Sequence, residues 1–83
     1  MTQTDQVRQY VRDYLVEPAR REGRSLVKVR AGDIHSAMGL QQRMPLVCSA
    51  LDADKFLVYA RVRLLERTGP KQSSTSEWVF GLK

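Results

Sequence analysis

Hydrophobic residues recur at helical spacing in the first part of the chain. They lie three or four positions apart with polar residues between them, and they are Val7, Tyr10, Val11, Tyr14 and Leu15. This spacing predicts an amphipathic helix from Thr4 to about Glu17. We expect Thr4 or Asp5 to cap its amino end, because a short side-chain oxygen accepts a hydrogen bond from the amides of the first turn. Pro18 lacks an amide hydrogen, so the helix is expected to kink or end near it.

A short strand and a short helix follow. Residues 26–30 alternate between apolar and basic side chains, with Val27 and Val29 on one face, which favours a strand. Residues 31–38 place small and apolar side chains on one side of a helix of about two turns. Gly39 comes next, where a left-handed carboxyl cap is expected.

A further helix is expected from Met44 or Pro45 to about Ala53, since proline suits a first helical turn. Its inward side chains would be Val47, Ala50 and Leu51. Residues 54–60 fit either a helical turn or extended chain, because a short apolar stretch matches both periods. We interpret them as a helical turn anchored by Phe56.

The last third of the chain has the pattern of two strands. Residues 61–67 alternate, with Val62 and Leu64 expected on one face. In residues 77–83 the side chains that share a face are Trp78, Phe80 and Leu82. The polar segment between them, residues 68–76, is too long for a tight hairpin turn.

Composition places the chain among ordinary globular domains. It has 83 residues, of which 42% are hydrophobic and 28% are charged. We therefore expect one domain over residues 1–83. No apolar run approaches the roughly 18 residues of a membrane span, and residues 1–5 do not resemble a signal peptide, so a cytoplasmic location is expected.

Charge favours a polyanionic partner and the remaining chemistry is sparse. The net charge is +5, which suits phosphate binding, although many small proteins carry such a charge for solubility alone. Cys48 is the only cysteine and His35 the only histidine. No zinc spacing, phosphate loop or catalytic constellation is present, so we expect neither an enzyme nor a cofactor or metal. A buried structural thiol and a structural or surface histidine are the expected roles.

The order of elements resembles the winged helix-turn-helix superfamily. The helix, strand, two short helices and final pair of strands match an α+β fold with three helices, a small antiparallel sheet and a carboxyl-terminal β-hairpin wing. The resemblance covers residues 5–82 and implies binding to double-stranded DNA, with the third helix in the major groove and the wing on the backbone. The residues that it implies as nucleic-acid contacts are Gln41, Gln42, Arg43, Met44 and Ser49 around the third helix, and Lys71, Gln72, Ser73, Ser74 and Thr75 in the wing.

Two departures from the simplest members favour backbone contact over base readout. The link from Gly39 to Pro45 is longer than a tight helix-turn-helix turn, and Asp52 and Asp54 lie near the end of the third helix. A phosphate is still favoured at the start of that helix, next to Arg43.

Simpler interpretations of the same residues stay open. Residues 41–43 can be a solvated link, and the segment around Lys71 can be a flexible loop without a partner. The three arginines of the first carboxyl-terminal strand can form a basic stripe or can discourage aggregation at a sheet edge; they are Arg61, Arg63 and Arg67.

The expected function is a DNA-binding winged helix, either a small transcriptional regulator or an accessory subunit. A homodimer through the first helix, around Tyr10 and Tyr14, would double its contacts. The alternative is a protein-interaction module that uses an exposed apolar patch on the third helix, formed by Met44 and Leu46.

Overall fold

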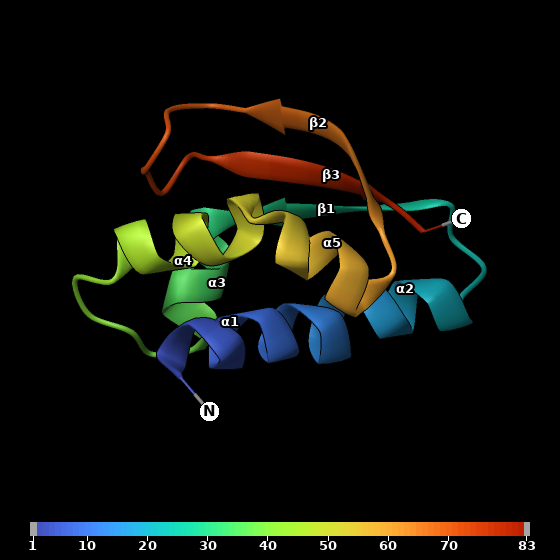
Figure 1. The fold of residues 1–83 in the computed structure, drawn as a ribbon, viewed down its shortest axis with the longest axis horizontal. Helices are drawn as coiled ribbons and strands as arrows, with labels where there is room; N and C mark the ends of the chain where they lie inside the picture. Colours follow the sequence, from blue (N-terminus) through green and yellow to red (C-terminus); the bar gives the residue numbers. More distant parts are fainter. Residues whose placement is uncertain (1, 83) are drawn as a thin grey trace.

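The computed structural model of this chain describes residues 2–82. A long helix lies along one side, a three-stranded sheet along the other, and shorter helices fill the space between (Figure 1). In chain order the elements are α1 (Gln3–Val11), η1 (Arg12–Val16), α2 (Glu17–Arg21), β1 (Leu26–Arg30), α3 (Ala31–Ala37), α4 (Met44–Asp52), α5 (Asp54–Ala60), β2 (Arg63–Thr68) and β3 (Glu77–Gly81). The expected α+β fold is confirmed, and this architecture is consistent with a winged helix.

The first helix begins at Gln3, one residue earlier than expected. Thr2 is its cap: the Thr2 hydroxyl accepts from the Asp5 amide at 3.2 Å, and the Asp5 carboxylate accepts from the Thr2 amide at 3.3 Å. This reciprocal pair is a capping box, in which two otherwise unpaired amides are satisfied together. The expectation of a cap at Thr4 or Asp5 is therefore wrong, because Asp5 supplies the second half of the motif.

Pro18 does not end the helix. The segment η1 is a single π-helical stretch, in which the Glu17 amide donates to the Arg12 carbonyl five residues back. Pro18 then occupies one of the first positions of α2, where a missing amide is tolerated. The helix continues to Arg21, and Gly23, at φ +77°, turns the chain toward the sheet.

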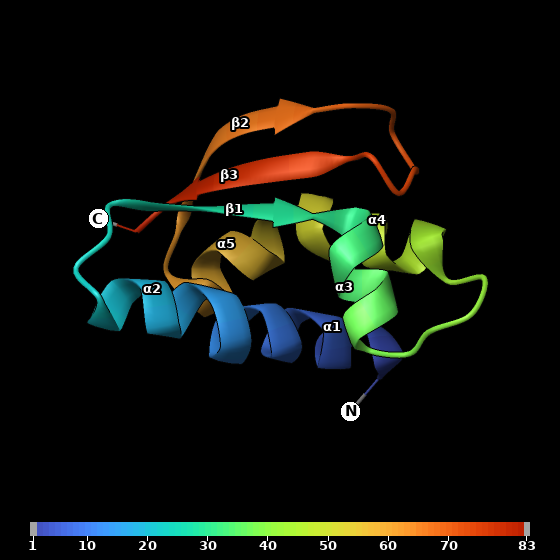
Figure 2. The same cartoon turned by 180° about the vertical axis from the view of Figure 1, so that it is seen from behind.

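The middle of the chain agrees with the sequence pattern. The strand at residues 26–30 buries Val27 and Val29, and α3 ends before Gly39, which has φ +66°. The helix α4 buries the three expected side chains together with Cys48. Residues 54–60 form the two-turn helix α5, which Phe56 anchors in the core and which adds a fourth helix to the three expected. Figure 2 shows α3 beside the long helix, seen from behind.

The strand β2 departs from simple alternation. Strand β3 lies between β1 and β2 and is antiparallel to both. A register shift falls between Leu64, which is opposite Phe80, and Glu66, which is opposite Val79. Such a bulge inserts one residue and reverses the faces of everything beyond it. Leu64 precedes the bulge, lies opposite the buried Phe80 and is 43% exposed. The expected alternation fails only beyond the bulge, where Arg67 lies opposite the buried Trp78.

One hydrophobic core joins the helices to the inner face of the sheet. Its largest fully buried side chains include Trp78, Phe56, Phe80 and Ile34. The rings of Phe56 and Phe80 lie 5.1 Å apart, between centroids, and connect α5 to β3. Among residues 2–82, no helix combines the length and the apolar character needed to cross a bilayer.

Candidate nucleic-acid interface

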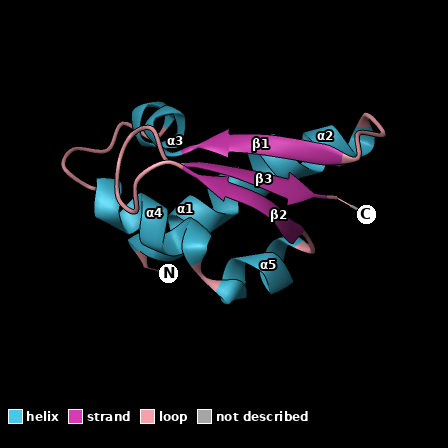
Figure 3. Cartoon of the chain, turned by 90° about the horizontal axis from the view of Figure 1, so that it is seen from above, coloured by secondary structure: helices cyan, strands magenta, loops and turns pink. Residues whose placement is uncertain are grey.

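Two loops that carry the predicted contacts lie at the same end of the molecule. We call residues 38–43, between α3 and α4, the link, and residues 69–76, between β2 and β3, the wing. Both lie at the end of the molecule opposite α2 (Figures 1 and 3). A single surface could therefore contact both.

The link has a part that packs on the core, formed by Met38 and Leu40, and a part that faces solvent. Gln41, Gln42 and Arg43 are exposed. The Arg43 amide donates to His35 Nε2 at 3.2 Å, which assigns a structural role to the histidine. Gln42 has φ +52°, a conformation that asparagine and glycine adopt more readily, and this turn directs Arg43 to the start of α4.

The amino end of α4 has no side-chain cap. Arg43 is the residue at the cap position, Pro45 follows within the first turn, and the Val47 amide is the first to donate back into the helix, to the Arg43 carbonyl at 3.0 Å. The positive end of the helix dipole and the amides of its first turn are therefore available to an anion. Arg43 adds a full positive charge at the same place.

Met44 and Leu46 do not form the exposed patch that the alternative function requires. Both are half-buried and pack against the core. Ser49 is exposed, as expected, and lines a shallow cleft of about 200 Å³ with Lys71 and Gln72 of the wing. The outer face of α4 thus meets the wing across a small gap.

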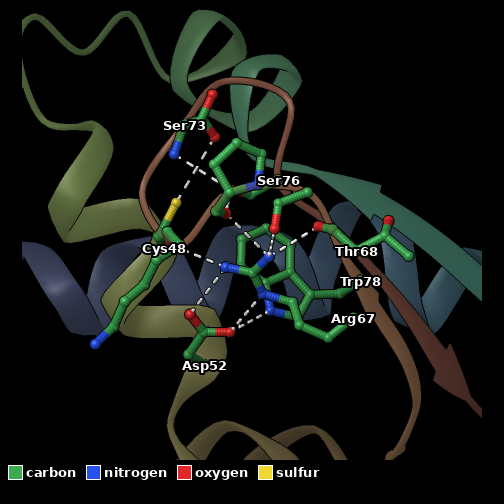
Figure 4. Close-up of polar contacts among 10 residues, drawn as sticks. Cys48, Asp52, Arg67, Thr68, Ser73, Ser76 and Trp78 are labelled. Carbon is green, nitrogen blue, oxygen red and sulfur yellow. Dashed lines mark hydrogen bonds and ion pairs between the residues drawn. The ribbon is translucent and has the colours of Figure 1, made fainter.

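The wing is folded back and fixed by Arg67 (Figure 4). Because of the bulge, Arg67 lies opposite Trp78 on the inner face of the sheet, with its guanidinium 4.8 Å from the centre of the indole ring. From there it donates to four consecutive carbonyl oxygens, those of Thr68 at 2.8 Å, Gly69 at 3.3 Å, Pro70 at 3.2 Å and Lys71 at 2.9 Å. A planar guanidinium with five donors suits such a set of acceptors.

Asp52 of α4 holds the other side of this guanidinium. Its carboxylate accepts from Arg67 Nε at 2.9 Å and Nη2 at 3.3 Å, and from Trp78 Nε1 at 2.7 Å. Partial burial by itself raises the pKa of Asp52, but these hydrogen bonds outweigh it and hold the pKa below its usual range. The bond to Asp52 in turn raises the pKa of Arg67. The wing, β2 and α4 are therefore joined through one ion pair.

Three hydroxyl groups of the wing, those of Ser73, Thr75 and Ser76, are bonded within the wing. The Ser73 hydroxyl is 3.1 Å from that of Thr75, and the Ser73 amide donates to Ser76 Oγ at 3.2 Å. Ser76, which is fully buried, donates to the Pro70 carbonyl. These bonds fix the turn from inside, so Ser73 and Thr75 have structural partners that their predicted role in DNA contact did not foresee.

The far side of the wing rests on α3. The Ser74 carbonyl accepts from the Gly32 amide at 3.0 Å. A Cβ at Gly32 would lie 2.9 Å from that oxygen, so only glycine allows this approach without a shift of the backbone. The wing is thereby supported from both helices of the α3–α4 pair.

The ten predicted contacts therefore divide into two sets. In the first set the side chains are exposed and make no hydrogen bond or ion pair with another element of the described chain. These residues are Gln41, Gln42, Arg43, Ser49, Lys71 and Gln72. Met44 packs on the core, and the Ser73 and Thr75 hydroxyls bond to each other. Ser74 contacts α3 through its main-chain carbonyl, and its side chain is exposed.

Arg67 and Asp52 are the residues that the sequence pattern missed. From the sequence, Arg67 was expected either to belong to a basic stripe or to discourage aggregation at a sheet edge. Asp52 was considered only as an acidic residue that disfavours base readout. The structure separates the three arginines: Arg61 caps α5 at φ +58°, Arg63 is on the outer face, and Arg67 is on the inner face. Only the bulge between Leu64 and Glu66 directs Arg67 inward, and no pattern in the neighbouring sequence indicates that bulge.

Comparison of the chain with known protein families, with characterised proteins and with solved structures finds no significant match.

Proposed function

We propose that this domain binds double-stranded DNA through the amino end of α4 and the wing, as a small regulator or an accessory subunit. The observation that carries the proposal is the common placement of two exposed cations, Arg43 and Lys71, on the two loops at one end of the molecule (Figure 3). Each stands beside main-chain or polar groups that suit a phosphate oxygen.

The free charge of these two residues supports the proposal. Within residues 2–82 neither Arg43 nor Lys71 has a carboxylate within 4.0 Å, whereas Lys28 pairs with Glu77 and Arg20 pairs with Glu17. An unpaired cation releases counterions from DNA without first breaking an ion pair. These two positions are therefore suited to bind the DNA backbone.

The outer face of α4 favours backbone contact over sequence readout. Its exposed side chains are Pro45, Ser49 and Asp52, none of which is a cation. Arginine and lysine supply the commonest specific contact to guanine, and a carboxylate repels phosphate. We therefore propose weak sequence preference, with positioning by Arg43 and Lys71.

The test is a titration of the full chain against a random-sequence duplex at low and moderate salt, followed by fluorescence anisotropy. Affinity should fall steeply with salt, and Arg43→Ala and Lys71→Ala should each weaken binding several-fold and reduce the salt slope by about 1. Arg24→Ala is the matched control, because it removes an exposed cation from the loop after α2, at the opposite end of the molecule. Equal losses in all three variants, or no salt-dependent binding, would contradict the proposal.

A two-fold dimer through the first helix is a separate part of the proposal. Tyr14 is 68% exposed and its ring lies 4.8 Å, between centroids, from that of the half-buried Tyr10. An exposed aromatic pair is a common centre of an interface. Sedimentation equilibrium of the wild type and of Tyr14→Ser tests it: a monomeric wild type at high protein concentration would exclude this dimer.

A further inference from the structure

The wing has a consistent orientation of its peptide groups. Four successive carbonyl oxygens, from Thr68 to Lys71, point toward the guanidinium of Arg67. The Pro70 oxygen accepts from the Ser76 hydroxyl as well. All of these acceptors lie on the inner side of the loop, where Figure 4 shows the guanidinium among them.

This orientation determines where the amide hydrogens point. The chain contains no cis peptide bond among its described residues. In a trans peptide group the carbonyl of one residue and the amide of the next point in opposite directions. The carbonyls of Pro70 and Lys71 point inward, so the amides of Lys71 and Gln72 point outward.

Those two amides are available to a ligand. Within residues 2–82 neither donates a hydrogen bond to a protein acceptor, and both residues are exposed. The ammonium group of Lys71 belongs to the same short segment and has no carboxylate partner within 4.0 Å in that part of the chain. Two successive outward amides beside a cation without an ion-pair partner form a donor set that suits an oxyanion.

We infer that the Lys71 and Gln72 amides, with the Lys71 ammonium group, form a phosphate-binding site, and that Arg67 is the residue that orients it. The inference rests on the proposed function in that the phosphate is taken to belong to a DNA backbone. Main-chain donors carry no base information, so the site binds duplexes of any sequence. Arg67 acts through the loop and does not touch the ligand.

The experiment follows the amide resonances of the ¹⁵N-labelled full chain by two-dimensional NMR. One sample is titrated with inorganic phosphate, a second with sodium chloride at matched ionic strength, and a third with a random-sequence duplex. The Lys71 and Gln72 amide signals should shift saturably with phosphate and with the duplex but not with chloride. Shifts no larger than those in chloride would overturn the inference, and this measurement needs no variant that could fail to fold.

Variants separate main-chain from side-chain binding. Gln72→Pro, which removes one outward N–H, should weaken phosphate binding about tenfold, more than Gln72→Ala, which removes only the side chain. Lys71→Ala should weaken it several-fold while the Gln72 amide still shifts. Arg67→Lys keeps the charge but offers three donors from a single nitrogen, so it should weaken phosphate binding by a similar factor. Arg24→Ala should bind phosphate as the wild type does.

The outcomes also distinguish this site from the proposed function. If phosphate shifts the two wing amides but no duplex binds, the site stands and the DNA-binding proposal fails. If the duplex binds with shifts confined to the link and the start of α4, DNA binding stands with that end of α4 as its contact, and the wing site is overturned.

Discussion

The link and the wing are both loops that carry exposed polar side chains, but they are held in different ways. At the end of the link, the Arg43 amide donates a hydrogen bond to the His35 side chain. The wing directs the carbonyls of Gly69, Pro70 and Lys71 to Arg67, and rests on Gly32 of α3. Its Ser73 carbonyl lies 3.9 Å from Cys48 Sγ of α4. The wing is therefore fixed by hydrogen bonds between its main chain and other elements, whereas the link is held by the packing of Met38 and Leu40 on the core and by the bond to His35.

This difference separates two ways of contacting an anion. In the link, Arg43 offers a long side chain that must lose rotamer freedom on binding. In the wing, the backbone donors are already oriented before a ligand arrives, which lowers the entropy lost on binding. Because they are held differently, the link and the wing are expected to respond independently to substitutions.

Arg67→Ala should have the largest effect. It removes charge-assisted hydrogen bonds to the wing and to Asp52, so we expect a loss of about 2–3 kcal/mol in the free energy of unfolding. Urea denaturation measures it. The matched control is Arg63→Ala on the outer face of the same strand, whose side chain makes no hydrogen bond or ion pair in the described part of the chain; it should change stability by less than about 0.5 kcal/mol. Similar losses in both variants would mean that Arg67 does not fix the wing.

Gly32→Ala should destabilise the contact between the wing and α3. The added Cβ would lie 2.9 Å from the Ser74 carbonyl oxygen, which forces a backbone shift that costs about 1–2 kcal/mol. The control is Ser36→Ala, an exposed position of the same helix. If Gly32→Ala were as stable as this control, the wing would not approach Gly32 closely enough to exclude a Cβ.

His35→Ala should act on the link alone. Loss of the acceptor for the Arg43 amide costs about 1 kcal/mol, because the site is exposed to water. Hydrogen exchange at the Arg43 amide should become faster, while the Ser73 and Thr75 amides of the wing keep their protection. Faster exchange in both loops would show that they are coupled.

Acidification should give the smallest effect. The pKa of Asp52 is lowered in the folded protein, so its contribution to stability is present above the usual pKa of an aspartate and is lost as the pH falls through the lowered value. The side chain is 36% exposed, which limits the effect to less than about 1 kcal/mol. Stability between pH 7 and pH 2 should therefore vary less in Asp52→Asn than in the wild type, and equal profiles would contradict this assignment.

Much of the fold could be predicted from local pattern. Val27 and Val29 alternate, and the apolar side chains of α4 recur at helical spacing, so these elements were correctly predicted to within about a residue. Of the two outcomes expected at Pro18, an end of the helix did not occur, because the π-helical stretch before it has a shifted hydrogen-bond register that a proline rule does not include. The alternation expected over residues 61–67 fails beyond Leu64 because it takes no account of the bulge, so Arg63 and Arg67 lie on opposite faces.

The candidate site was predicted only in part. The exposed residues Arg43 and Lys71 follow from a polar link before a helix and a polar loop between strands. The anchoring of the wing could not be predicted, because Arg67 and Asp52 are fifteen positions apart and meet only when β2 pairs with β3 above α4. The sequence of residues 73–75 is the same whether their hydroxyl groups contact DNA or bond within the wing. The bond between Ser73 and Thr75 could therefore not be predicted.

The periodicity of apolar residues thus determined the identity and order of the helices and strands, because burial of a face is a property of neighbouring residues in the chain. Tertiary packing alone decided which way β2 faces after its bulge, and with it whether Arg67 points to solvent or to the wing. A one-residue shift in strand register reverses every following side chain at little local cost, so only the contacts with Trp78 and Asp52 could select the observed register.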